Sequence, residues 1–174
     1  MNPLAVPVGR HDGQSVLGVK LVLTCAGRLL TCMRDDFAHI PWPAHWDLPG
    51  GGPEAGETAA DCALRELAEE FGLSLTRERL LNETRFRHPC AGAGEGVSVF
   101  FTGHLSAEEV GAIRFGNEGQ FWALMPAEVY IRHPRAVPHF RPRVAICLGS
   151  GVTETSSGAP GHQLSHRQAE SFPL

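Results

Sequence analysis

The sequence has no long hydrophobic run and no secretory leader. No apolar stretch approaches the roughly 20 residues that a membrane-spanning helix requires. The first ten residues contain no basic segment followed by an apolar one, as a secretory signal would. The sequence therefore predicts a cytoplasmic protein with no membrane partner.

Cysteines occur without any regular spacing. They are five in number and form no C-x-x-C pair: Cys25, Cys32, Cys62, Cys90 and Cys147. An odd, scattered set favours neither a zinc site nor a disulfide framework. We expect each to be a small core residue in a reducing compartment. The nine histidines show no H-E-x-x-H or comparable spacing, so a zinc site gains no support from them either.

An excess of positive charge is also lacking. Fifteen Lys and Arg residues stand against nineteen Asp and Glu, which gives a net charge of −4 and a pI near 6.1. A protein that binds nucleic acid regardless of sequence would show a basic stripe. We therefore expect no stable nucleic-acid partner.

The composition that is present suits one globular domain. Apolar residues make up 43% of the 174 positions and charged residues 20%, enough to build one sizeable core. Residues 1–14 and 149–174 are dominated by small and polar residues, and we interpret them as a loose leader and a flexible tail. Residues 15–148 are the predicted domain.

Strand and helix patterns alternate within this domain. Two β-rich runs on either side of a short turn containing Gly27 predict a hairpin over residues 15–35. A structured loop is expected at 37–49. Three further strands and two short helices are predicted, the strands at 80–88, 97–105 and 120–125 and the helices at 126–130 and 141–148. This interleaving indicates a mixed α/β sandwich.

The clearest helix covers residues 58–71. Thr58 can cap its start, with Asp61 three residues later in an arrangement like a capping box. Gly72 stands where a left-handed residue would end it. At 100° per residue, one face of this helix carries the apolar stripe predicted to meet the core, made of Ala60, Leu64, Leu67 and Phe71.

Three glutamates gather on roughly the opposite face of the same helix. Glu66, Glu69 and Glu70 stand at spacings of three and four, where like charges repel. One interpretation is an ordinary acidic face exposed to solvent. The other is a site for a hard divalent cation, Mg²⁺ or Mn²⁺, which prefers oxygen ligands, with the carbonyl of Gly50 or Gly51 beside the carboxylates.

The spacing of the whole segment favours the second interpretation. Gly51, five residues, Glu57, seven residues, Arg65-Glu66-Leu67, one residue, Glu69-Glu70, one residue and Gly72-Leu73 resembles the full signature of the Nudix hydrolases. The resemblance implies an α/β/α sandwich with a mixed β-sheet. It also implies a hydrolase that cleaves nucleoside diphosphates linked to another group, with Mg²⁺ or Mn²⁺ as cofactor.

The resemblance assigns roles residue by residue. It implies that Glu66, Glu69 and Glu70 are metal ligands beside the Gly50 carbonyl, and that Glu57 and Arg65 form a pair bracing the loop against the helix. The general base is either a glutamate of the signature or one on a downstream loop. Glu118, four residues before Trp122, is the downstream candidate; the alternative is an ordinary loop carboxylate.

The substrate is less well defined by sequence. A compact core without the markers of other branches is most similar to MutT-like members, which hydrolyse a (d)NTP or oxidised (d)NTP to NMP and pyrophosphate. The alternatives are an ADP-ribose or ADP-sugar hydrolase, a dinucleoside polyphosphate hydrolase, an RNA pyrophosphohydrolase, or a non-catalytic nucleotide sensor. A monomer or a homodimer is expected.

Several side chains are candidates for holding the nucleotide. Aromatic rings can stack on a base, and guanidinium groups suit phosphates. Each has a plain structural alternative, as a core aromatic or a surface ion pair. The candidates are Phe37, Trp42, Trp46, Phe86, Arg34, Arg85 and Arg87, of which we select Arg34, Trp46 and Phe86.

Overall fold

A mixed β-sheet forms the centre of the molecule. The computed structural model describes residues 10–11, 14–88 and 96–149. Its seven strands are β1 (Arg10–His11), β2 (Gln14–Cys25), β3 (Arg28–Met33), β4 (Trp46–Asp47), β5 (Asn82–Arg87), β6 (Gly96–His104) and β7 (Phe121–Pro126). The leader and tail predicted from sequence lie almost entirely outside the described residues, as does Cys90.

The sheet combines parallel and antiparallel pairs. Its main path runs β4-β3-β2-β6-β5, with β1 on β2 and β7 on β3. Of the strand pairs in the described residues, β2 and β6 alone run parallel, over a register from Ser15↔Gly96 to Thr24↔His104. The other pairs are antiparallel. The predicted fold class, α/β with a mixed sheet, is confirmed.

The predicted hairpin is real but short. Strands β2 and β3 meet only near their turn, at Thr24↔Leu29 and Cys25↔Arg28. Beyond that point β2 pairs with β6 and β3 pairs along its length with β7. Ala26 and Gly27 both have positive φ, 47° and 74°, as a tight hairpin turn requires. The turn is local, whereas the partners of the two strands come from far along the chain.

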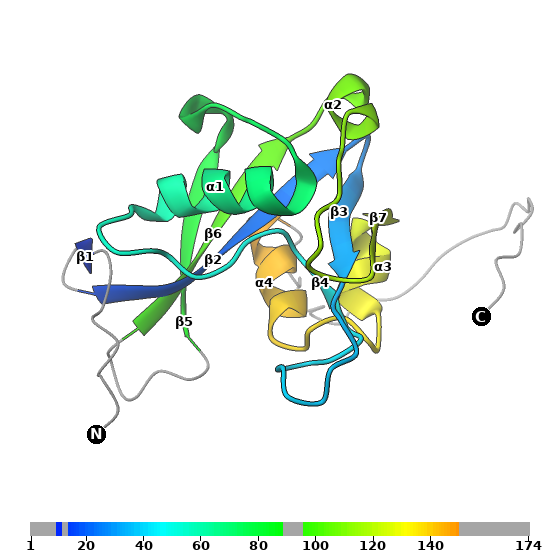
Figure 1. Cartoon of the computed structure of the whole chain (residues 1–174), viewed down its shortest axis with the longest axis horizontal. Coiled ribbons are helices and arrows are strands. Elements are labelled where there is room, and N and C mark those ends of the chain that lie inside the picture. The colour runs from blue at the N-terminus through cyan, green and yellow to red at the C-terminus, as the bar shows by residue number, and fades with distance from the viewer. Residues whose placement is uncertain (1–9, 12–13, 89–95, 150–174) are drawn as a thin grey trace, which may run out of the picture.

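Helices cover both faces of the sheet (Figure 1). They are α1 (Ala59–Phe71), α2 (Ala107–Gly111), α3 (Ala127–Arg132) and α4 (Phe140–Cys147), with a 3₁₀ turn, η1 (Arg77–Arg79). Along β2, Leu21 and Leu23 belong to the core beneath α1, whereas Val22 belongs to the core shared with α3 and α4. Alternate residues of one strand thus face two helical layers, which makes an α/β/α sandwich.

Helix α1 begins and ends as its sequence predicts. The Thr58 hydroxyl accepts a hydrogen bond from the Asp61 amide at 3.2 Å and donates to the Asp61 carboxylate at 2.6 Å. Gly72 has φ 65° and closes the helix through a hydrogen bond from its amide to Ala68. The buried face differs in part from the predicted stripe: Cys62 and Ala63 are fully buried, whereas Leu64 is only partly so.

Other elements depart from the sequence prediction in detail. Pro126 caps α3 rather than opening it. Helix α2 was not predicted, although Ser106 and Glu109 form a complete capping box at its start. The predicted loop 37–49 contains the two residues of β4.

The cysteines are structural where they are described. Cys32 and Cys62 are buried and Cys25 and Cys147 are partly buried, and all four are free thiols. Among the described residues, none of the helices has the length and apolar character needed to cross a membrane.

Candidate active site

A glycine loop lies between β2 and the acidic side of α1. The β2 amides of Val19 and Leu21 donate to the carbonyls of Gly51 and Pro49, at 2.8 and 2.9 Å, which docks the loop on the sheet. Gly50 has φ 126°, and a Cβ there would overlap the Val19 carbonyl. A Cβ at Gly51 would overlap the Glu66 carboxylate. Only glycine allows this close approach of loop, strand and helix.

Arg65 ties the loop to the helix. Its Nε and Nη2 donate to the two oxygens of Glu57 at 2.9 and 3.0 Å, and Nη2 also donates to the Gly52 carbonyl at 3.0 Å. Its Nη1 donates to Glu66 at 2.9 Å and to Glu69 at 3.0 Å. The hydrogen bonds from Arg65 hold the pKa of Glu57 below its usual value. The Arg65 guanidinium therefore donates hydrogen bonds to the carboxylates of Glu57, Glu66 and Glu69.

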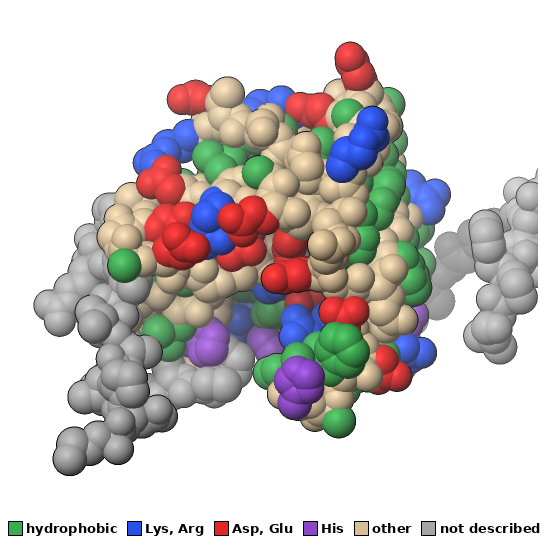
Figure 2. Space-filling view, viewed as in Figure 1, with side chains coloured by type: hydrophobic (Ala, Val, Ile, Leu, Met, Phe, Trp, Pro, Cys, Tyr) green, Lys and Arg blue, Asp and Glu red, His purple; other side chains and the backbone are tan. Residues whose placement is uncertain are grey.

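Four glutamates from two segments surround one cleft. Glu66, Glu69 and Glu70 of α1 face Glu118 and Asn117 of the loop before β7 across a volume of about 220 Å³. The loop is fixed there because the Gly116 amide donates to the Glu70 carbonyl at 2.8 Å. Figure 2 shows the acidic side chains gathered over α1. Glu118, predicted from sequence as a separate candidate, thus lies with the helix glutamates.

The two most buried glutamates of this cleft, Glu66 and Glu70, have raised pKa values. Burial raises the pKa of Glu70 to about 7, although Lys20 and a 2.9 Å hydrogen bond from the Gly50 amide oppose the shift. Burial also raises the pKa of Glu66, with the charges of Glu69 and Glu118 adding to it. Both carboxyl groups therefore hold a proton more readily than an exposed glutamate does, because burial penalises the charged form.

The donor set fits a hard divalent cation. The carboxylates around the cleft offer oxygen ligands only, which Mg²⁺ and Mn²⁺ prefer. In the part of the chain that the structure describes, no three His, Cys, Asp or Glu side chains already converge as a finished metal cage. Glu66 and Glu69 instead bind Arg65. Each of these contacts uses one carboxylate oxygen, so Glu66 and Glu69 each keep a second oxygen that could bind a cation.

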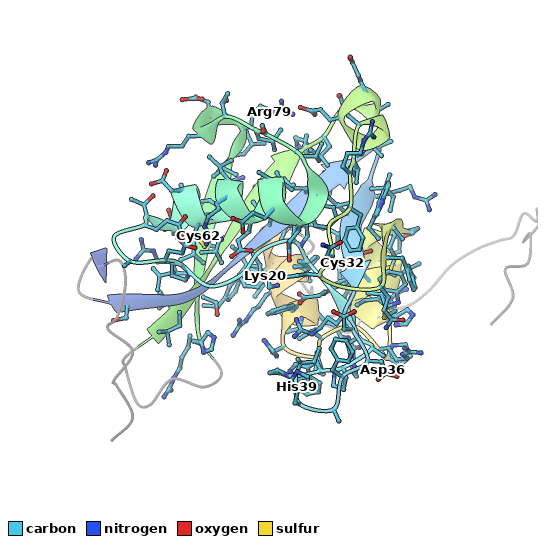
Figure 3. The ribbon with its side chains drawn as sticks, viewed as in Figure 1. Lys20, Cys32, Asp36, His39, Cys62 and Arg79 are labelled. Atoms are coloured by element: carbon cyan, nitrogen blue, oxygen red, sulfur yellow. The ribbon has the colours of Figure 1, made fainter. Side chains whose placement is uncertain are left out.

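A buried ion network, not predicted from sequence, lies beside this cleft. Asp47 accepts from Lys20 at 3.0 Å, from Arg34 at 2.6 Å and from the Leu48 amide at 2.7 Å. Lys20 also donates to the carbonyls of Leu48 and Gly50, at 3.0 and 2.8 Å. Figure 3 shows Lys20 between α1 and α4. The Gly50 carbonyl, predicted as a metal ligand, is thus already held by an ammonium group.

Arg34 links the ion network to the glutamates. A cleft of about 320 Å³ is lined by residues of the ion network and by two of the glutamates, together with their neighbours: Cys32, Arg34, Asp35, Ile40, Asp47, Glu70, Glu118 and Gly119. Arg34 can donate to a phosphate of a ligand bound in this cleft, since guanidinium groups pair well with phosphates. Lys20 lies within β2 and Asp47 follows Trp46. Neither residue belongs to a recognisable sequence motif, so neither was predicted.

The structure separates the remaining predicted substrate residues from these clefts. Trp46 packs edge-on against Phe121 and His133, at 5.5 and 6.3 Å between ring centroids. Phe86 packs against Phe100, at 5.1 Å. Both are partly buried against the core shared with α3 and α4. Their roles in substrate binding stay predictions.

Three comparisons with known proteins agree on one family. A family model described as the NUDIX domain matches residues 15–144. The chain is 37% identical over 78 residues to the 8-oxo-dGTP diphosphatase of Haemophilus influenzae, covering 44% of this chain and 52% of that protein. It is 44% identical over 59 residues to the RNA pyrophosphohydrolase of Dinoroseobacter shibae, covering 34% of each. The matches thus span about half or less of these relatives. The MutT protein of Methanosarcina mazei shares the fold, with a TM-score of 0.61 and 17% identity over 79% of this chain and 96% of that one.

Proposed function

The chain belongs to the Nudix hydrolase family, and from that premise we propose that it hydrolyses a (d)NTP or an oxidised (d)NTP to the nucleoside monophosphate and pyrophosphate. Members of the family act on small nucleotides and generally use divalent metal ions. The proposal names the substrate class and takes Mg²⁺ or Mn²⁺ as the ion. The observation that carries it is the cleft where Glu118 meets the glutamates of α1.

In this proposal Glu66, Glu69 and Glu70 hold the ion. When bound, a divalent cation supplies the positive charge that offsets the pyrophosphate oxygens and makes the attacking water more acidic. Glu57 holds Arg65, which also donates to the Gly52 carbonyl, so the pair keeps the loop fixed against the helix. Arg34, which lines one cleft together with Glu70 and Glu118, contacts the phosphates.

Glu118 is the proposed general base. It lines the cleft with the ligand glutamates and also the neighbouring cleft with Arg34. There it accepts a proton from the water that attacks phosphorus. The P–O bridge then breaks, and the leaving oxygen departs as part of pyrophosphate, leaving the monophosphate. Positioning and charge compensation account for most of the rate.

A screen with added metal tests the proposal. Wild-type protein is incubated with Mg²⁺ or Mn²⁺ and (d)NTPs, 8-oxo-dGTP, ADP-ribose, ADP-sugars, dinucleoside polyphosphates and 5′-triphosphorylated RNA, and the products are identified. We expect monophosphate and pyrophosphate from a nucleoside triphosphate, with loss of activity in Glu69→Gln. Glu108→Gln, on the exposed side of α2, is the matched control and keeps full activity.

Two results would contradict the proposal. One is no metal-dependent product from any triphosphate. The other is full activity in Glu69→Gln. Preferential release from RNA would instead support the second candidate, an RNA pyrophosphohydrolase, which is favoured by the relative that shares 44% identity over 59 residues.

A further inference from the structure

The loop between α2 and β7, which carries Glu118, is attached at its start to the end of α1. Figure 1 shows this loop passing the end of α1 on its way to β7. The Arg114 amide donates to the Phe71 carbonyl at 2.9 Å. Two residues later, the Gly116 amide donates to the Glu70 carbonyl at 2.8 Å. The first half of the loop is therefore fixed to the last turn of the helix that carries the other glutamates.

The second half of the loop is attached to the residues that follow β3. The Gly119 amide donates to the Asp35 carboxylate at 3.1 Å, across 84 positions of sequence. The side-chain amide of Gln120 donates to the Arg34 carbonyl at 2.8 Å. Both donors come directly after Glu118 in the chain. The segment that carries Arg34 therefore also holds the residues next to Glu118.

The backbone at Gly119 approaches β3 as closely as a residue without a side chain can. Gly119 has φ 91°, and a Cβ there would lie 2.8 Å from the Met33 carbonyl oxygen. The same carbonyl accepts a hydrogen bond from the Gln120 amide at 2.8 Å. Only glycine permits this approach, because any Cβ would push the loop away from the strand. A small displacement of the loop would move Glu118 with it.

Asp35 is itself held firmly enough to position what it binds. Its side chain is partly buried, and its carbonyl accepts a hydrogen bond from the Ala44 amide at 3.0 Å. The residue before it, Arg34, donates to the buried Asp47 at 2.6 Å. Asp35 also lines the 320 Å³ cleft together with Arg34 and Glu118. A side chain whose own backbone is fixed in this way can hold a functional group in place.

The position of Glu118 depends on the backbone that carries it, because its side chain is exposed on a loop. A general base must lie within hydrogen-bond reach of the water from which it takes a proton. Displacement of a catalytic group by about 1 Å can lower a rate by about 100-fold. We propose that Asp35 is a positioning residue, which holds Glu118 at the attacking water through the Gly119 amide. This inference rests on the proposed function for the role of Glu118.

Two substitutions of Asp35 test the hydrogen bond by steady-state kinetics on a triphosphate that the wild-type protein hydrolyses. Asp35→Ala removes the acceptor, and we expect kcat to fall by about 10-fold to 100-fold with KM within about twofold of wild type. Asp35→Asn keeps an acceptor oxygen without the charge, and kcat should stay within about fivefold of wild type. Asp36→Ala, at the exposed neighbouring position labelled in Figure 3, is the matched control with wild-type kcat.

A double-mutant cycle separates positioning of Glu118 from a general structural role. In a Glu118→Gln background the base is already lost, so Asp35→Ala should lower kcat by less than about twofold. A residue that only supports the fold would lower kcat by the same factor in both backgrounds. Mn²⁺ affinity of Asp35→Ala should remain within about twofold of wild type, because the ion is held by carboxylates of α1 in the proposed site.

Amide hydrogen exchange of the metal-free protein, followed by NMR, tests the attachment without any turnover. The Gly119 amide should exchange at least about tenfold faster in Asp35→Ala than in wild type, and at the wild-type rate in Asp36→Ala. Gly119→Ala is a second route to the same displacement, because it leaves Asp35 intact and forces the loop off β3. Its kcat should fall as that of Asp35→Ala does. Thermal unfolding of each variant checks its fold.

Three results would overturn the inference: wild-type kcat in a folded Asp35→Ala or Gly119→Ala, equal losses in both backgrounds of the cycle, and a loss in Asp35→Asn as large as that in Asp35→Ala. The last would mean that the charge of Asp35 contacts ligand directly. Full turnover in Glu118→Gln would also overturn it, while triphosphate hydrolysis would stand. If the wild-type protein hydrolyses no triphosphate, the proposed function fails, and hydrogen exchange still decides whether Asp35 holds the loop.

Discussion

The acidic cleft and a pocket of about 350 Å³ that contains Trp42, His139 and Phe140 are joined by a third cleft, and they differ in charge. The acidic cleft gathers Glu66, Glu69, Glu70 and Glu118, whereas the charged residues of the pocket are Lys20, Arg34 and Asp47. Three of the four cleft glutamates come from five consecutive positions of α1. The pocket is lined by residues spread from position 20 to position 140. The acidic cleft is thus built mainly from neighbours in sequence, and the pocket is not.

The two regions also differ in how their charges are balanced. In the pocket, Lys20 and Arg34 neutralise Asp47, and the pKa of Asp47 stays below its usual value despite burial. In the cleft, Arg65 is the shared cation, and the pKa of Glu70 rises to about 7. Asp47 is thus stabilised in its charged form by two adjacent cations, whereas burial favours the neutral form of Glu70. Each prediction below perturbs one region and asks whether the other responds.

The largest effect is expected from Glu69→Gln. Removal of one proposed metal ligand should lower kcat by about 10³-fold, because several kcal/mol of charge stabilisation is lost. Affinity for a nucleoside monophosphate, measured by calorimetry, should remain within about twofold of wild type, because Glu69 lines the cleft and not the pocket. A parallel loss of this affinity would show that the two regions act as one.

Replacing Glu118 distinguishes a general base from a metal ligand. Glu118→Gln should lower kcat by about 10²–10⁴-fold, as loss of a general base does, while Mn²⁺ affinity stays close to that of wild type. Steady-state kinetics and a metal titration on the same sample check both. Unchanged turnover would make Glu118 an ordinary loop carboxylate.

Glu70 should make the metal-free protein less stable as the pH rises. Between pH 4.5 and about 7, the folded protein keeps a proton on Glu70 that the unfolded chain has released. The free energy of unfolding therefore decreases across this window, by up to about 3 kcal/mol. Glu70→Gln should lose this dependence and be the more stable protein at pH 8 in EDTA, as measured by urea unfolding. Parallel pH profiles for the two proteins would refute this account of Glu70.

The smallest effect is expected from Trp42→Ala in the pocket. Loss of one stacking face should raise KM about tenfold and change kcat little, because the reacting atoms lie in the cleft. Phe37→Ala, on the same loop but outside the pocket lining, is the matched control. A fall in kcat with unchanged KM would place Trp42 in the chemistry instead.

The sequence predicts the local features around α1 better than the contacts between distant segments. The signature in and around α1, its cap at Thr58 and its end at Gly72 are local patterns, and the structure reproduces the helix. The long parallel pairing of β2 with β6 joins residues about 80 positions apart, and no local pattern specifies it. The buried Lys20–Asp47 pair depends on the pairing of β4 with β3 and on the docking of the glycine loop on β2, which no local pattern specifies either. Helix α2 was missed although its capping box, Ser106 with Glu109, is visible in the sequence.

Direct binding of Mn²⁺, followed by electron paramagnetic resonance, tests the central claim that the α1 glutamates form a divalent-metal site. Wild-type protein should bind Mn²⁺, and Glu66→Gln, Glu69→Gln and Glu70→Gln should each weaken that binding by at least about tenfold, while Glu108→Gln should not. Mn²⁺ affinity equal to that of wild type in all three variants would contradict the account.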